Sequence, residues 1–228
     1  MKAAILIANL FIPSLSYADV LIGTARNSKG EVVYLERHHI QKDEAGLNKL
    51  IRVEYMKPGG EVFATMTSDF SKNKMIPETV FEDMRFKTKS TLRVLATAVE
   101  FQEFKNEISM SQSFQPLSGL MVAGQGFDNF IRKHSGDLAN GPLKFRFGVL
   151  SKMDFYSLTG YRRESNSSGV IEYGIKASNW LARLFASELR ITYDAESMRL
   201  KSFSGRSNIS DDRGRAQNVT IDYEWSDS

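Results

Sequence analysis

The chain has 228 residues, with 30 Lys or Arg against 27 Asp or Glu, a formal net charge of +3 and no cysteine. Because charges of both signs are scattered and nearly balance, the chain has no electrostatic footprint for nucleic acid, and we expect no nucleic-acid partner. The length is ample for one hydrophobic core, and the absence of cysteine excludes a disulfide scaffold and a thiol nucleophile.

Residues 1–18 have the layout of a secretory signal peptide. Lys2 gives a positive start, and a ten-residue apolar run follows it. Ser16 and Ala18 supply the small side chains that cleavage before Asp19 requires. The run is too short to span a bilayer, which takes roughly 20 residues, and no cysteine follows it for lipid attachment. We therefore expect cleavage, export to the periplasm of a Gram-negative bacterium, and no stable membrane insertion.

The mature chain, residues 19–228, is dominated by alternation of apolar and polar residues, which is the pattern of half-buried β-strands. In chain order, strands are predicted at residues 20–26, 31–40, 49–57, 61–67, 79–88, 91–104, 143–149, 153–163, 170–177, 188–193, 198–206 and 219–225. The alternation is clearest in 143–149, where Leu143, Phe145, Phe147 and Val149 should be buried and Lys144 and Arg146 exposed.

Turn residues separate these runs at hairpin distances, as at Asn27–Gly30, Lys57–Gly60 and Ser165–Gly169. About a dozen short strands joined by tight turns predict a single β-rich domain. Its fold class would be mainly β: a strongly curved antiparallel sheet, either a half-barrel or an open barrel, or a sandwich.

Residues 127–138 have helical spacing instead. Gly126 precedes this segment and Pro142 follows it, as at the ends of a helix. The apolar residues that would share one helical face are Phe127, Phe130, Ile131 and Leu138. A second helical turn is predicted at 179–185, with Trp180 on its apolar face. We expect one or both helices to pack on the concave face of the sheet.

Asp83 and Arg85 lie two positions apart in a predicted strand and would share a face of the sheet. They indicate either an ion pair that braces the sheet or a polar anchor in an apolar pocket. The fifteen Phe, eight Tyr and two Trp are either core or the lining of a cavity for a hydrophobic ligand. If a cavity exists, the candidate ligand-binding residues are Asp83, Arg85, Phe127, Phe130 and Trp180.

Motifs for catalysis, cofactors and metals are missing from the sequence. Gly124-Gln125-Gly126 precedes a helix but lacks the spacing of a nucleotide-binding loop, so we expect a turn with positive φ there. His38 and His39 are adjacent in a strand, point to opposite faces and cannot easily bind one ion. A serine nucleophile elbow is also absent. We predict no catalytic residue, no cofactor and no metal.

Several fragments together suggest a relationship: Glu82–Arg85, Val122–Ile131, Asn179–Leu184, Leu189–Asp194 and Leu200–Ile209. In these the chain resembles an uncharacterised family of exported bacterial proteins with a domain of unknown function (DUF3108-like). That family is similar in architecture to the lipoprotein-carrier proteins of the bacterial envelope, in which a curved antiparallel sheet wraps helices around an apolar cavity. The resemblance implies the same fold and an apolar or lipid-like ligand.

We therefore predict a soluble periplasmic protein that binds a hydrophobic or lipid-like ligand without catalysis, or that maintains the envelope. Two alternatives stay open, a small outer-membrane β-barrel and an enzyme whose cavity site lacks recognisable motifs. The helix in mid-chain and the uneven strand lengths count against the membrane barrel. The sequence names no partner protein.

Overall fold

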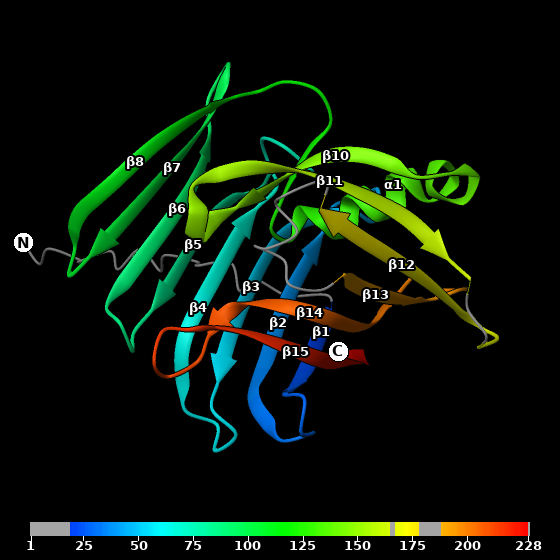
Figure 1. Cartoon of the computed structure of the whole chain (residues 1–228), viewed down its shortest axis with the longest axis horizontal. Coiled ribbons are helices and arrows are strands. Elements are labelled where there is room, and N and C mark those ends of the chain that lie inside the picture. The colour runs from blue at the N-terminus through cyan, green and yellow to red at the C-terminus, as the bar shows by residue number, and fades with distance from the viewer. Residues whose placement is uncertain (1–18, 165–166, 178–187, 228) are drawn as a thin grey trace, which may run out of the picture.

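The computed structural model describes residues 19–164, 167–177 and 188–227. These residues form one sheet of fifteen strands, one α-helix and one short 3-10 helix (Figure 1). The strands are β1 (Asp19–Arg26), β2 (Val32–Lys42), β3 (Asn48–Met56), β4 (Val62–Asp69), β5 (Glu78–Asp83), β6 (Thr88–Val94), β7 (Ala98–Lys105), β8 (Ile108–Pro116), β9 (Met121–Ala123), β10 (Leu143–Val149), β11 (Asp154–Arg163), β12 (Val170–Ala177), β13 (Leu189–Asp194), β14 (Leu200–Ser210) and β15 (Ala216–Asp227). Helix α1 spans Gly126–Asn140 and the 3-10 helix η1 spans Leu150–Lys152.

The strand order in the sheet is β8-β7-β6-β5-β4-β3-β2-β1-β15-β14-β13-β12-β11-β10-β9. Neighbouring strands are antiparallel, apart from the parallel pair β9–β10. Because β8 and β9 stand at opposite ends of this order, the sheet is not closed by hydrogen bonds. It curls strongly around its own concave face, which confirms the predicted open, curved antiparallel sheet (Figure 1).

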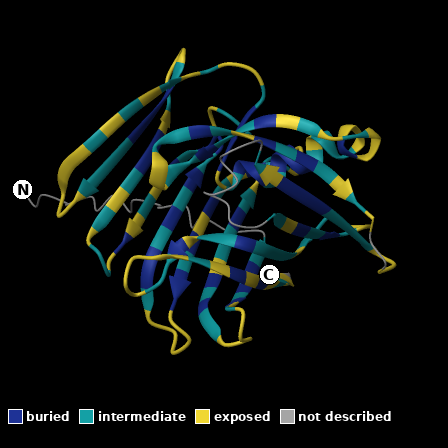
Figure 2. Cartoon of the chain, in the orientation of Figure 1, coloured by how far each residue is buried: buried dark blue, intermediate teal, exposed yellow. Residues whose placement is uncertain are grey.

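The buried side chains form three clusters. Figure 2 marks the buried positions along the strands. The first lies on the inner face of β1–β4, β14 and β15, the second joins α1 to β10–β13, and the third joins β6 and β7 to β9 and β11. In the third cluster the rings of Phe101 and Phe155 lie edge to face with centroids 5.6 Å apart. The two arms of the open sheet therefore meet through side-chain packing instead of strand pairing.

Helix α1 confirms the helix predicted at 127–138. Gly124, at φ +47°, makes the turn that precedes the helix, as expected of a glycine there. At Gly126 the helix touches the loop between β4 and β5 so closely that a Cβ atom would lie 2.0 Å from the carbonyl oxygen of Met75. Asn129 Nδ2 donates to the Lys74 carbonyl at 2.8 Å and ties α1 to the same loop. Among the described helices, none is long and apolar enough to cross a membrane.

The strand boundaries predicted between residues 79 and 104 were wrong. The structure divides this region into β5, β6 and β7, with turns at 84–87 and 95–97. Neither turn contains Gly or Pro, so the sequence carried no strong signal for either. Strands β8 and β9 were also not predicted. The second helix expected at 179–185 lies outside the described residues.

The burial predicted for 143–149 is only partly right. Phe145 is buried and Lys144 is exposed, as expected, but Leu143, Phe147 and Val149 are half-buried. Arg146 is half-buried as well, and Gly148 on the same face is buried. The reason is that β10 is covered on both faces, since a Cβ at Gly148 would lie 2.9 Å from the Phe155 ring on the side away from α1.

Candidate functional site

An open hollow of about 590 Å³ lies where α1 ends, between that end and the β11–β12 hairpin. We call it the end hollow. It is lined by Leu138, Ala139, Asn140, Gly141, Pro142, Tyr161, Arg162, Arg163, Glu164, Val170 and Ile171. The helix stops at Asn140 while β11 and β12 continue, and the inner face of these two strands is left uncovered beyond the helix end.

Successive side chains of β11 point to opposite faces of the sheet, and this alternation places Arg162 on the same face as Leu158 and Gly160. Leu158 and Gly160 lie on the face that α1 covers, and a Cβ at Gly160 would be 3.5 Å from Leu138. Arg162 is the next residue on that face, and it is exposed because the helix no longer covers it. On β12, Ile171 packs against the second core cluster and lines the same hollow. The end hollow thus combines one exposed guanidinium group with apolar side chains.

The two arginines of the end hollow differ in their partners. Arg163 binds the Glu172 carboxylate through Nε and Glu188 Oε2 through Nη1, the latter at 2.6 Å. No hydrogen bond or ion pair joins Arg162 to another residue in the described part of the chain. Arg162 lies opposite Tyr173 in the β11–β12 ladder, and burial raises the pKa of that phenol. Arg162 is thus a cation beside apolar side chains, and the exposed carboxylate of Glu164 lines the same hollow.

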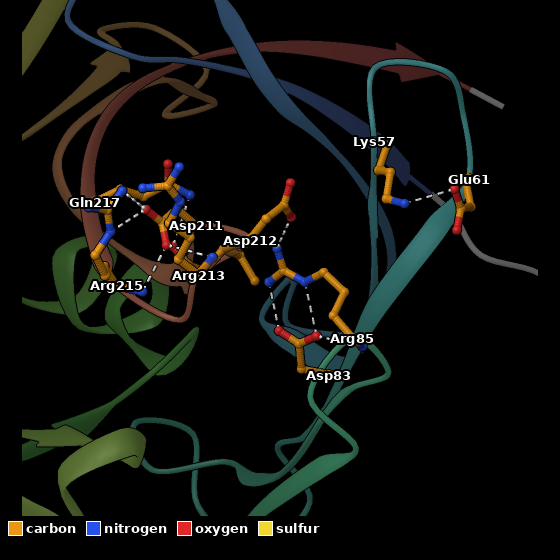
Figure 3. Close-up of polar contacts among 10 residues, drawn as sticks. Lys57, Glu61, Asp83, Arg85, Asp211, Asp212, Arg213, Arg215 and Gln217 are labelled. Atoms are coloured by element: carbon orange, nitrogen blue, oxygen red, sulfur yellow. Dashed lines mark hydrogen bonds and ion pairs between the residues drawn. The ribbon is translucent and has the colours of Figure 1, made fainter.

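Asp83 and Arg85 form the predicted ion pair, but not on one strand. Asp83 ends β5, whereas Arg85 lies in the turn that follows. Arg85 Nη2 reaches Asp83 Oδ2 at 2.7 Å and its Nε reaches Oδ1 at 3.0 Å (Figure 3). Its Nη1 donates to Asp212 Oδ1 at 3.1 Å, and its guanidinium stacks over the Phe63 ring at 4.0 Å. Burial opposes the charged form, but the two carboxylates raise the pKa of Arg85 above its ordinary value.

Arg85 connects two parts of the curled sheet that are far apart in the strand order. Figure 3 shows Arg85 reaching from the turn after β5 to the hairpin between β14 and β15, strands that stand six and five places from β5 in the sheet order. Asp83 is 3% exposed and both of its carboxylate oxygens are engaged by Arg85. The arrangement braces the sheet, while a role for Asp83 and Arg85 in ligand binding stays a prediction.

Phe127 and Phe130 belong to the second core cluster, whereas Phe63, on which Arg85 stacks, belongs to the first. Phe130 is fully buried and its ring centroid is 4.6 Å from that of Phe145. Phe127 packs on the same ring at 6.0 Å. Neither phenylalanine lines the end hollow, and Trp180 lies outside the described residues. The structure thus brings Phe127 and Phe130 together, but separately from Asp83 and Arg85.

A buried polar cluster on the inner face of β2 was not identified from the sequence. Glu36 is 4% exposed, and its Oε2 accepts from Tyr223 Oη at 3.1 Å and lies 2.8 Å from His38 Nε2. Nearby, Tyr34 Oη pairs with Ser207 Oγ at 2.8 Å, and Tyr55 Oη accepts from an asparagine of β14 at 3.0 Å. Burial, and then the charge of Glu36, raise the pKa of both Tyr34 and Tyr55.

Gly23 makes room for this cluster. It lies opposite Glu36 on one side and Tyr223 on the other in the strand ladders, and a Cβ there would be 2.8 Å from the Tyr223 ring. The missing side chain lets that ring cross β1 and reach Glu36. The spacing of Tyr34, Glu36 and His38 by two residues is the sequence signal that could have revealed the cluster.

Comparisons with known proteins add an architectural likeness. No family model matches the chain, and a search of curated proteins finds no match. Among solved structures, the chain is similar to one described as a beta-barrel-like protein of domain of unknown function DUF1849 from Brucella abortus. The identity is 6% and the TM-score 0.47, over 92% of this chain and 97% of that chain. Such a likeness identifies neither a family nor a function, and the resemblance to the exported family stays a prediction.

Proposed function

We propose that the protein is an exported, non-catalytic binding protein of the bacterial envelope, and that an amphipathic, lipid-like anion occupies its end hollow. The observation that carries this proposal is the uncovered inner face of β11 and β12 beyond the end of α1, where Arg162 stands beside apolar side chains. The predicted relationship to lipoprotein-carrier proteins agrees with a lipid-like ligand.

The two parts of such a ligand have separate places. Pro142, Val170 and Ile171 offer apolar surface to an acyl chain. Arg162 offers a planar guanidinium to a carboxylate or a phosphate, with which it can form charge-assisted hydrogen bonds. Fatty acids and phospholipids share this chemistry.

Binding is favoured over catalysis by the residue types at this site. The described residues that line the end hollow include no Ser, Thr, Cys, His or Asp, and their one carboxylate is Glu164. A nucleophile paired with a base, as acyl transfer requires, is not available from these residues.

Export is the second part of the proposal, and it depends on residues 1–18. The small side chains of Ser16 and Ala18 predict cleavage before Asp19. N-terminal sequencing of the protein from its own periplasm should give Asp19 first. Retention of residues 1–18 in a membrane fraction would contradict this part.

Fluorescence titration of residues 19–228 with a dansylated long-chain fatty acid tests the proposed site. We expect saturable binding that the methyl ester of the same probe, which lacks the negative charge, reproduces only weakly. Arg162→Glu should weaken binding of the acid by about 10- to 100-fold, because a hydrogen bond to a charged group is worth roughly 1.5–3 kcal/mol.

Arg52→Glu is the matched control, because Arg52 is also exposed on a strand but lies on β3. It should leave the affinity unchanged. Equal affinity of the Arg162→Glu variant and the native chain would remove the proposed site, and a lack of saturable binding would remove the proposed function.

A further inference from the structure

The edge strand β8 presents three large apolar side chains that the rest of the described chain leaves exposed. It stands at one end of the sheet order and pairs only with β7 (Figure 1). Ile108, Met110 and Phe114 are 67%, 61% and 56% exposed, which makes them the three most exposed large hydrophobic side chains of the described residues. Exposed positions recur along the strand in Figure 2.

The composition of β8 leaves this edge unprotected. Its nine residues, ISMSQSFQP, include no charged side chain, and its proline stands at the end of the strand. Natural edge strands are usually guarded by charges or by shortness, since a free row of backbone N–H and C=O groups pairs readily with another chain. A register shift against β7 isolates Met110, but Ser111–Pro116 pair regularly. Six regular residues are a typical strand length.

The other edge of the sheet cannot serve as the partner of β8. Strand β9 has three residues, all buried, and the N–H of Ala123 already donates to the Met75 carbonyl at 2.9 Å. A head-to-tail pairing of β8 with β9 of a neighbouring molecule is therefore blocked. Pairing of β8 with β8 remains, and this arrangement closes on itself as a two-fold dimer.

We infer that β8 pairs antiparallel with β8 of a second copy of this chain. The uncharged sequence suits self-pairing, because a strand that carries one sign of charge would place like charges opposite each other. If the pairing is centred on the regular segment Ser111–Pro116, the two-fold axis passes through Ser113 or through Phe114. The outer face of the joint would then bury Phe114 of both copies and make one continuous sheet across the dimer.

Sedimentation of residues 19–228 at about 100 µM tests the inference, and a dimer is expected. Phe114→Lys should give a monomer, because two lysines would meet across the joint. Val80→Lys is the control, since Val80 is 38% exposed on the interior strand β5 and offers the same charge and the same loss of apolar surface. A monomeric native chain, or equal dissociation by both variants, would overturn the inference.

Single cysteines test the same joint by cross-linking, and the native chain has no cysteine to interfere. Residues directly opposite in antiparallel strands lie roughly 5 Å apart at Cα, within the range of a disulfide. Ser113→Cys or Phe114→Cys should form dimers on mild oxidation. Thr220→Cys, on the doubly paired strand β15, should not. Equal oxidation at all three positions would contradict specific pairing.

Discussion

Glu36 shows how one residue depends on the positions around it. Its carboxylate is buried on the inner face of β2, where Tyr223 and His38 are its hydrogen-bond partners. Burying a charge without such partners costs several kcal/mol of folding free energy. The hydrogen bonds of Tyr223 and His38 to Glu36 therefore offset that cost together. Gly23 is part of that unit, because only a residue without a side chain leaves space for the Tyr223 ring.

Removing the Tyr223 hydroxyl should expose this dependence. Tyr223→Phe should lower the free energy of unfolding by about 1.5–3 kcal/mol, the worth of a hydrogen bond to a charged group. Urea unfolding measures it. In a double-mutant cycle with Glu36→Gln, the two changes should couple by more than about 0.5 kcal/mol, since they act on one contact. Additive effects would show that the hydrogen bond does not stabilise the fold.

The sequence could predict that Tyr34, Glu36 and His38 share a face, because strands alternate. It could not predict that this face is the buried one. Val33 and Leu35 make the other face of β2 equally apolar, and a carboxylate argues against burial unless its partners are known. Tyr223, which donates to Glu36, and Ser207, which pairs with Tyr34, lie 187 and 173 residues later in the chain, on β15 and β14. Only the folded sheet brings them together.

Individual helices and strands could be predicted from the sequence where the apolar residues kept their spacing over a long segment and where glycine or proline stood at its ends. Helix α1 has glycine before it and Gly141-Pro142 after it, and its predicted range is correct within two residues at either end. By contrast, the turn between β7 and β8 is formed by Asn106 and Glu107, both with positive φ, and Glu107 gives no turn signal. Strand β8 was missed because its apolar residues face solvent.

Strand β10 offers a test of burial at the level of one element. Phe145→Ala should lower the free energy of unfolding by about 3–5 kcal/mol, because Phe145 is 3% exposed and packs against Phe130. Lys144→Ala, on the exposed face, should change it by less than about 0.5 kcal/mol. Thermal or urea unfolding measures both. Similar losses at the two positions would mean that the inward face of β10 is assigned wrongly.

The interior of the molecule contains buried tyrosines whose phenol groups resist ionisation. Tyr34, Tyr55 and Tyr193 are at most 2% exposed, and burial is the main reason that their pKa values are raised. A nearby carboxylate adds to the effect, from Glu36 for the first two and from Asp128 for Tyr193. The folded chain therefore keeps these phenols protonated when the unfolded chain does not.

Stability should consequently fall in alkaline solution. Below pH ~10, the ordinary pKa of tyrosine, the phenols are neutral in both states and the full stability is present. Above it the unfolded chain loses protons that the folded chain retains, so each buried tyrosine destabilises the fold by roughly 1.4 kcal/mol per pH unit. Urea unfolding from pH 8 to 11 should show a flat region and then a decline. Ionisation of Tyr34, Tyr55 and Tyr193 near pH 10 in a folded chain, followed at 295 nm, would contradict this.

The central claim is that the end hollow beside Arg162 holds a lipid-like anion. Native mass spectrometry of the protein purified from its own periplasm tests it most directly, because a retained ligand reveals its own mass. We expect a protein that carries an acidic lipid or a fatty acid, and a folded Arg162→Glu variant that has lost it. A ligand-free native protein, or the same ligand retained by the variant, would contradict the account.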